Sequence, residues 1–462
     1  MLSASYPFYY DDAFISFRIT ENLREGNGPF LFPGKHAYTS TSLLYPYLNL
    51  IPAFLIGEGW IENIPVWNGC WMALSFCLCL LQACRNFPPG KWYFPLLAIL
   101  PVLPWLFEEM NFIFGNSGLE TSIYMASLAA MLPVKQNRKF SAWLILIRPE
   151  GWLAGWAVWV DSIWNKDKSA IISSSLQLFL SLACWIMAGL LLFGSPIPLS
   201  ILAKANHLID RPNELMKGFS YALFADHILP MAIFVLAAYR VPRFLVFNRP
   251  LILWTLFYLL FFSLAASWWP WYTPPLFIGF WYLGISAALN LLNTLKFNPK
   301  LLLIPGLLFL VYGGWQIARQ IPGIKKKSDA CAIRRKASKQ LTVYLKTQKP
   351  AGSRMLLEPL GMISWYGPEL NILDYPGLSS PDMTAFLKTL PWKIPHRLTD
   401  SKTDSAILAQ FKPAILVLWP EEKEAFSKLY LFKENYRFTG KLPYYPELPE
   451  MDSVSVYNKI IH

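Results

Sequence analysis

AIISSSLQLFLSLACWIMAGLLLF occupies residues 170–193 and holds no charged side chain. An apolar run of about 17–25 residues is long enough to cross a bilayer as a helix. Several other runs between residues 41 and 320 reach that length, whereas residues 321–462 have the composition of a soluble domain. Only 15% of all residues are charged, against about 25% in ordinary soluble domains. The sequence therefore predicts a polytopic α-helical membrane protein with a C-terminal soluble α/β domain.

The apolar runs divide the chain into three predicted parts. Residues 1–42 form an external loop with an acidic pair and an amphipathic helix, residues 43–320 the transmembrane helical domain, and residues 321–462 an extracytoplasmic α/β domain. The ten candidate spans are 43–57, 65–84, 92–107, 119–134, 140–164, 170–193, 218–240, 250–268, 274–294 and 300–319. Ten crossings place both ends of the chain on one side of the membrane.

Basic residues indicate which side that is. Lys and Arg cluster at 240–249 and 296–300, and such clusters mark the cytoplasmic face. The first loop and the soluble domain are therefore expected outside. Lys135, Arg138 and Lys139 favour a cytoplasmic loop at a place that ten crossings would put outside. The topology of residues 85–165 therefore stays open, with re-entrant hairpins as the alternative.

The last third of the chain has the pattern of a small sheet with flanking helices. Residues 328–347 have helical spacing of apolar positions. Strand patterns lie at 353–358, 370–375 and 414–419, and helical patterns lie between and after them at 382–389 and 421–430. The net charge of +12 comes without any groove-reading motif, so basic residues flanking membrane helices explain it and no nucleic-acid partner is expected.

Two adjacent carboxylates, Asp11 and Asp12, stand near the start of the chain, before a short amphipathic run. Asp12 could N-cap a helix over residues 13 to about 25 that lies in the membrane interface. The apolar face of that helix would be formed by Phe14, Ile15, Phe17 and Ile19. A cap needs one aspartate, however, so Asp11 is left over and a functional pair is the alternative.

Further charged or titratable residues interrupt the apolar segments, where they usually face a cavity or a partner. They are Glu120 in NSGLET (116–121), Arg148 and Glu150 in IRPEGW (147–152), Lys204 in FGSPIPLSILAKA (193–205), and Asp226 and His227 in FADHILP (224–230). Each also has a structural interpretation. Glu120 can favour a helix N-terminus, Arg148 can pair with Glu150, Lys204 can extend toward water, and Asp226 can bond His227. Together they predict a polar cavity near the external face.

Five motifs in order resemble a known family. DDAFISFRITENLREGNGPFLFPG (11–34), followed by YTSTSLLYP (38–46), is similar to the first external loop of membrane glycosyltransferases of the C-type superfamily. The likeness is to the bacterial branch that includes the mycobacterial terminal arabinofuranosyltransferases. SGLET (117–121), RPEG (148–151), the Gly194, Pro198 and Lys204 spacing, and GMISWYGPELNILDYPGLSS (361–380) also match. The last resembles the family's strand–loop–strand ending in D-x-x-G-L.

The sequence also departs from that family's pattern. Phe14 stands for Tyr, Phe32 for Asn and Lys35 for Glu, and the usual PNT before the loop lysine is PLS at 198–200. WWPWYTPP (268–275) lacks the arginine that the family often has late in the membrane domain. The family's first span is not seen before Asp11, so either the N-terminus lies free on the outside or a first helix is missing from this sequence, and we favour the second.

The resemblance implies a transferase that moves a sugar from a polyprenyl-phosphate-linked donor to an envelope glycan or glycolipid acceptor, such as lipopolysaccharide, with inversion. It implies a multi-pass protein of the bacterial inner membrane, in contact with membrane lipids, whose active site and C-terminal domain face the outside. The sugar, hexosyl or pentosyl, the acceptor and the linkage stay open.

The resemblance also suggests roles for the candidate residues. Asp11 or Asp12 would be the general base, with Asp11 preferred because Asp12 has a capping role available. Lys204 would bind the donor phosphate, with Arg148 as the second choice. Glu120, Glu150, Asp226 and His227 would orient the acceptor or the first loop. No cofactor is certain, although Mg²⁺, Mn²⁺ or Ca²⁺ could sit among Asp11, Asp12 and Glu120.

Two other function classes fit a protein of this kind. A transporter or flippase for lipid-linked sugars would also have many spans and charges at membrane depth, but it should show paired repeats, which the sequence lacks. A catalytically degenerate protein of envelope assembly is the third reading. Replacing Asp11 and Asp12 by Asn distinguishes these classes, because only an enzyme would lose glycan transfer while still inserting normally into the membrane.

Overall fold

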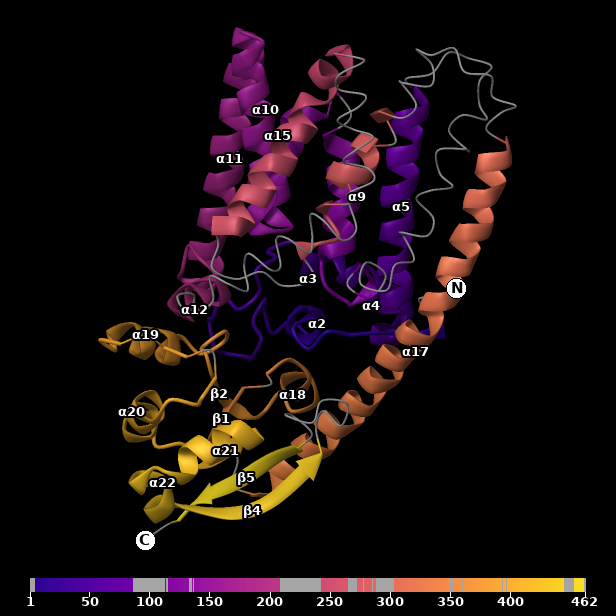
Figure 1. Ribbon diagram of the computed structural model, residues 1–462. Coiled ribbons are helices and arrows are strands. Elements are labelled where there is room, and N and C mark those ends of the chain that lie inside the picture. The colour runs from indigo at the N-terminus through magenta and orange to yellow at the C-terminus, as the bar shows by residue number, and fades with distance from the viewer. Residues whose placement is uncertain are drawn as a thin grey trace.

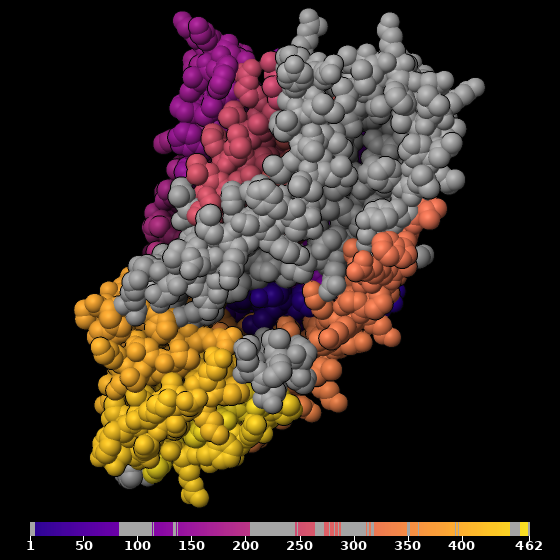
Figure 2. Space-filling view, in the orientation of Figure 1, coloured from indigo at the N-terminus to yellow at the C-terminus, as the bar shows by residue number. Residues whose placement is uncertain are grey.

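The computed structural model describes residues 5–85, 113, 115–132, 135, 137–207, 242–264, 272–276, 278–284, 286–287, 303–348, 352–358, 360–392, 394–395, 397–443 and 453–460. A bundle of helices forms one end of the molecule, and an α/β domain forms the other (Figure 1). The first segment of the chain lies between them, and its indigo atoms show at the waist of the space-filling view (Figure 2).

The bundle is built from helices that run side by side (Figure 1). They are α5 (Ile64–Arg85), α9 (Thr121–Met131), α10 (Trp152–Trp164), α11 (Lys168–Phe193) and α15 (Pro242–Leu264). Helix α11 begins at Asp167, whose side chain accepts the Ala170 N–H at 3.0 Å. It ends at Gly194, which takes φ +68, a left-handed conformation that glycine adopts at little cost.

Large apolar side chains face outward on the bundle. On α11, Ile172, Phe179 and Leu191 are 70%, 68% and 77% exposed. Within the described residues, two helical segments are long and apolar enough to cross a membrane, Trp60–Gln82 and Lys168–Phe193. Only 17% of the apolar window in the second is buried inside the protein. An apolar surface of this extent is disfavoured in water, so the bundle has the exterior of a protein embedded in lipid.

The structure revises several predicted spans. The predictions for 65–84 and 170–193 correspond to the two long apolar helices. The segment 43–57 holds the short helices α3 (Tyr45–Leu48) and α4 (Leu50–Ile56), and 119–134 holds the 11-residue α9. Residues 92–107 and 218–240 and parts of 274–294 and 300–319 lie outside the described residues.

A single span over 140–164 is wrong. That segment consists of the 3₁₀ helices η2 (Arg138–Leu146) and η3 (Pro149–Gly151), followed by α10. Proline lacks the N–H that a continuing helix needs. A Cβ on Gly151 would lie 2.3 Å from the Leu144 carbonyl, so the chain folds tightly back on η2 at this point.

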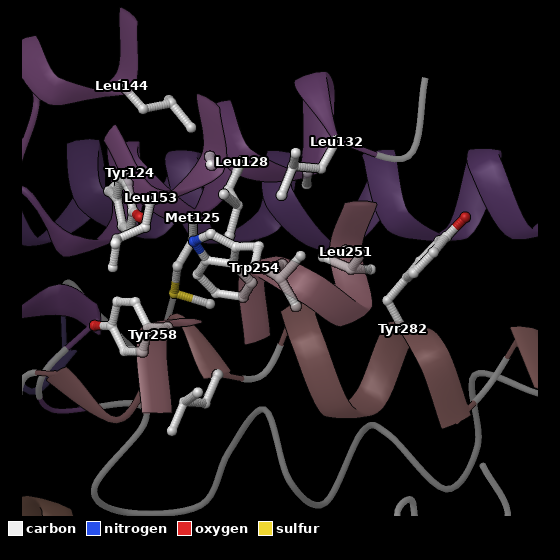
Figure 3. Packing of buried hydrophobic residues seen from close by; sticks show 14 of the residues in the cluster. Tyr124, Met125, Leu128, Leu132, Leu144, Leu153, Leu251, Trp254, Tyr258 and Tyr282 are labelled. Atoms are coloured by element: carbon white, nitrogen blue, oxygen red, sulfur yellow. The ribbon is translucent and has the colours of Figure 1, made fainter. Parts of the chain in front are cut away.

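The core of the bundle is aromatic and apolar. Trp254 on α15 is fully buried among side chains of α9 and α15, including Met125, Leu128, Leu251 and Tyr258 (Figure 3). The Trp254 and Tyr258 rings are 5.1 Å apart. Helix α9 packs mainly on α5, and α15 packs mainly on α10, so the side chains of this cluster help to join the helices of the bundle.

The C-terminal domain contains a five-stranded sheet in the order β2-β1-β3-β5-β4. The strands are β1 (Arg354–Leu357), β2 (Asn371–Asp374), β3 (Ile415–Leu418), β4 (Tyr436–Pro443) and β5 (Ser453–Lys459). Strand β1 pairs in parallel with β2 and β3, with Met355 opposite Ile372 and Ile415, while β5 is antiparallel to β3 and β4. The three predicted strands are confirmed, and β4 and β5 are additions.

Helices accompany this sheet and join it to the bundle. The 46-residue α17 (Leu303–Gln348) runs from beside the bundle into the C-terminal domain (Figure 1), so the predicted boundary at residue 320 falls inside a continuous helix. The others are α18 (Gly361–Tyr366), α19 (Pro381–Thr389), α20 (Ser401–Phe411), α21 (Pro420–Ser427) and α22 (Tyr430–Asn435). Residues 361–366 are therefore helical, and the strand within the 361–380 motif is β2, which the pattern at 370–375 predicted.

Helix α2 (Ala13–Arg24) lies between the bundle and the C-terminal domain (Figure 1). Ile15 and Ile19 pack with the apolar side chains of the sheet. Phe14 and Phe17 pack in a separate cluster with Trp60. The predicted single apolar face and membrane-interface position are therefore wrong, because α2 is buried by protein on both faces.

Candidate functional site

The side chain of Asp11 joins the first loop to the C-terminal domain. Its Oδ2 accepts the Gly361 N–H and its Oδ1 the Met362 N–H, each at 2.9 Å. A Cβ on Gly361 would lie 1.9 Å from the Asp11 carbonyl oxygen, so glycine is required for this approach. Burial raises the pKa of Asp11, and the two amide hydrogen bonds act in the opposite direction.

Asp12 occupies the N-cap position of α2 but does not cap it. Its backbone has helical angles, φ −59 and ψ −25, and its side chain makes no capping hydrogen bond to the described first turn. Capping side chains need a non-helical backbone at this position. The capping role expected for Asp12 is therefore wrong, and the reason for preferring Asp11 as the base no longer holds.

The SGLET motif packs against residues that flank the acidic pair. The Tyr10 N–H donates to the Ser117 carbonyl at 3.0 Å, and the Tyr45 hydroxyl donates to the Gly118 carbonyl at 2.6 Å. Gly118 has φ +82, and a Cβ there would lie 2.6 Å from the Phe17 ring. Both facts require glycine in this motif, and they place the start of α9 beside the start of α2.

The RPEG motif forms a buried ion cluster. Arg148 Nε lies 2.5 Å from Glu150 Oε1, and Arg148 Nη1 lies 3.6 Å from Glu120 Oε1. Nη1 also donates to the Thr121 hydroxyl at 3.0 Å. Arg148 is 2% exposed, and a buried charge is stable only when it is paired. The predicted pairing of Arg148 with Glu150 is confirmed, and Glu120 joins it at the N-cap of α9.

The segment with the Gly194, Pro198 and Lys204 spacing contacts the first loop at Tyr38. The Leu199 N–H, at the start of α12 (Leu199–His207), donates to the Tyr38 carbonyl at 2.7 Å. The Tyr38 ring stacks on Phe193 with centroids 4.4 Å apart. Helix α12 carries Lys204 and contacts α19 of the C-terminal domain. Asp226 and His227 lie outside the described residues.

One acidic side chain near the pair was not predicted. Glu358 follows β1, and the indole N–H of Trp419 donates to its carboxylate. Burial raises the pKa of Glu358 to about 6, and the nearby charge of Asp11 also raises it. Glu358 could have been found from the sequence, because it ends the SRMLLE strand pattern and side chains that follow parallel strands often line functional sites.

The metal hypothesis gains no support from this geometry. Among the described residues, no group of three His, Cys, Asp or Glu side chains is arranged to hold a metal ion. The set Asp11, Asp12 and Glu120 does not assemble, because Asp11 is bound to the amides of α18 and Glu120 faces Arg148.

Contacts connect all five motifs: SGLET, the Gly194–Lys204 segment and the 361–380 motif each contact the first loop or its start, and RPEG contacts SGLET. Residues 10–12 contact Ser117 and residues 361–362, and Tyr38 contacts Leu199. The RPEG arginine reaches the last two residues of SGLET. Segments separated by hundreds of residues in the chain are therefore joined by a connected set of contacts.

Comparison with known proteins gives limited matches. A family model described as "Domain of unknown function (DUF8728)" matches residues 330–457, which cover the sheet domain. No curated protein matches the chain. Two solved structures of ArnT from Cupriavidus metallidurans are similar to it, one in the apo state and one bound to undecaprenyl phosphate. They are 15% and 14% identical, with a TM-score of 0.47, over 99% of this chain and 95% of theirs. These values are too low to transfer the activity of either protein.

Proposed function

We propose that the chain is a membrane glycosyltransferase that transfers a sugar from a polyprenyl-phosphate donor to a glycan or glycolipid acceptor. The observation that carries the proposal is that Asp11 joins the first loop to the 361–380 motif, while the neighbouring Tyr10 bonds to the SGLET motif. A substrate carried on an isoprenoid lipid also accounts for a bundle with an apolar exterior. The reaction would take place on the outer face of the bacterial inner membrane.

The proposed chemistry is a single displacement at the anomeric carbon. The acceptor hydroxyl attacks that carbon, its proton passes to a carboxylate, and the bond to the phosphate oxygen breaks. The phosphate leaves with the bonding electron pair, so the configuration inverts. The departing phosphate is already a good leaving group, and the main tasks are therefore removing the proton and neutralising the new negative charge.

We assign the base to Asp12 and an anchoring role to Asp11. Both oxygens of Asp11 accept backbone N–H groups of α18, so this carboxylate is committed to holding the two domains together. Asp12 is the other carboxylate of the predicted pair, and its helical backbone rules out the capping role that competed with catalysis. Lys204 on α12 would neutralise the phosphate, while Arg148 is engaged by Glu150 and Glu120.

Substitution of each aspartate tests this division of roles. We expect Asp12→Asn to lower kcat by about 10²–10⁴-fold, the usual contribution of a general base, with normal insertion and thermal stability. Asp11→Asn should lower thermal stability more than kcat. The measurement is release of polyprenyl phosphate from a radiolabelled polyprenyl-phosphate sugar in proteoliposomes. Asp329→Asn, at an exposed position on α17, is the matched control.

The competing functions predict other outcomes. If Asp11→Asn abolishes transfer and Asp12→Asn does not, the two roles are exchanged. If both variants transfer sugar at the normal rate, the acidic pair is not the base. If the wild-type protein moves the labelled lipid across the bilayer without cleaving it, the chain is a transporter of lipid-linked sugars.

A further inference from the structure

A cavity lies between the first loop and the edge of the sheet, away from the contacts of Asp11. Its volume is about 390 Å³, within the range of small-molecule sites. It is lined by Lys35, His36 and Ala37 from the first loop, and by Arg354, Asn371, Ile372, Leu373, Ser379, Ser380, Pro381 and Asp382 from the C-terminal domain. A ligand bound here would touch both parts of the protein.

Two cations from different parts of the chain meet in this cavity. Lys35 Nζ donates to the amide oxygen of Asn371 at 2.7 Å, which is a neutral partner. Burial and the neighbouring Arg354 lower the pKa of Lys35, as expected for like charges held near each other. Arg354 lies 3.8 Å from Asp382, and both side chains are largely exposed, so this ion pair is weak. An anion between Lys35 and Arg354 would relieve their repulsion.

The opposite wall offers groups suited to sugar hydroxyls. The hydroxyls of Ser379 and Ser380 donate to Asp374 Oδ1 at 2.6 and 2.7 Å. Their hydrogens are therefore committed to Asp374, and the Ser379 oxygen can act toward a ligand only as an acceptor. Asp374 is completely buried, so this arrangement is rigid. Apolar Ile372, Leu373 and Pro381 complete the wall.

We propose that this cavity is a subsite for an acidic sugar of the acceptor glycan, with Lys35 and Arg354 binding its carboxylate or phosphate and Ser379 accepting from a ring hydroxyl. An inorganic anion would bind only Lys35 and Arg354, and a neutral sugar would bind only Ser379 and the apolar side chains beside it. Its role as an acceptor subsite rests on the proposed transferase function, whereas its affinity for acidic sugars does not.

The test is direct binding to the full chain in nanodiscs of zwitterionic lipid, without donor. The probes are glucuronic acid, glucose 6-phosphate, glucose and inorganic phosphate, followed by ligand-observed NMR. We expect both acidic sugars to bind more tightly than glucose or phosphate. Lys35→Gln and Arg354→Gln should each weaken acidic sugars by about tenfold, the value of one charge-assisted hydrogen bond. Ser379→Ala should weaken the sugars without affecting phosphate.

Two controls separate this inference from the proposed function. Lys388→Gln, at an exposed position on α19 outside the cavity, and Asp12→Asn should both bind the acidic sugars like the wild type. Equal affinity of the wild type and the Lys35 and Arg354 variants would overturn the subsite. Inorganic phosphate binding as tightly as glucose 6-phosphate would overturn sugar recognition. If transfer is never observed but these binding differences hold, the transferase function fails and the acidic-sugar site stands.

Discussion

Individual charged residues in this protein are held in very different ways. Arg148 is buried but has two carboxylates and a hydroxyl around it, so its charge is balanced. Asp404 on α20 is also buried, yet neither of its carboxylate oxygens has a hydrogen-bond partner among the described residues. A buried polar group without a partner costs stability. Burying the charged form of Asp404 therefore lowers the free energy of unfolding.

The pH dependence of stability should report this cost. Burial raises the pKa of Asp404 to about 8, and neighbouring Asp400 also raises it. A carboxyl with a raised pKa contributes stability below its unfolded pKa, about 3.9, and that contribution is lost as the pH rises through 8. We expect Asp404→Asn to remove this loss and to stabilise the protein at pH 8–9 by about 1–3 kcal/mol, with little change near pH 4.

Thermal unfolding of the purified protein across pH 4–9, followed by tryptophan fluorescence, measures this effect. Asp382→Asn is the control, because its side chain is 71% exposed and should leave the pH profile unchanged. Parallel profiles for the wild type and Asp404→Asn would contradict the prediction.

Among the elements, helix α2 determines how the two ends of the molecule meet. Its isoleucines pack on the sheet and its phenylalanines pack on the cluster around Trp60. Glu21 on the same helix accepts the Trp60 indole N–H at 3.0 Å. Because both faces of α2 are used, its position is determined by the bundle and by the C-terminal domain together. The residues before α2 come closest to α18 at Gly361, where even a Cβ atom would overlap the Asp11 carbonyl.

Substitution of this glycine should loosen the docking of α18 on α2. The added methyl group in Gly361→Ala would overlap the Asp11 carbonyl, 1.9 Å away, and strain of this kind costs about 1–3 kcal/mol. We expect faster hydrogen exchange in residues 361–366 and 11–24, with unchanged exchange in α20. Gly314→Ala is the control, since a Cβ there has no atom within 4 Å. Unchanged exchange at both segments would show that the docking does not depend on this contact.

At the scale of the whole molecule, the apolar exterior of the bundle indicates that the bundle is surrounded by lipid and not by water. The outward side chains of α11 are apolar over most of the helix length, whereas the C-terminal domain buries its apolar side chains around the five-stranded sheet. A lysine at the bilayer centre costs about 2.5–3.5 kcal/mol, far more than a lysine on a surface in water.

Phe179→Lys, near the middle of α11, tests this division. We expect it to reduce the fraction of protein that inserts into the membrane, measured by carbonate extraction. Tyr430→Lys is the control, because Tyr430 is 72% exposed but belongs to the C-terminal domain. If Phe179→Lys inserts as well as Tyr430→Lys, the exposed face of α11 does not lie against lipid.

Local patterns in the sequence were sufficient for much of the fold. The 24-residue apolar run at 170–193 predicted α11, and short apolar runs predicted β1, β2 and β3. Strands β4 and β5 were missed. Strand β4 is largely exposed along its length and is interrupted by a bulge between Phe438 and Gly440. Such an edge strand has little of the apolar alternation on which strand prediction depends.

By itself, the sequence determined the apolar bundle, the α/β domain and the residue types of the candidate site, because helix length, strand alternation and motif spacing are properties of neighbouring residues. Only the tertiary structure decided that Asp11 binds the α18 amides, that Asp12 leaves α2 uncapped, and that Lys35 meets Arg354. Those contacts join segments up to about 350 residues apart, and they depend on how buried surfaces of α2 fit both domains at once. No local pattern of side chains carries that information.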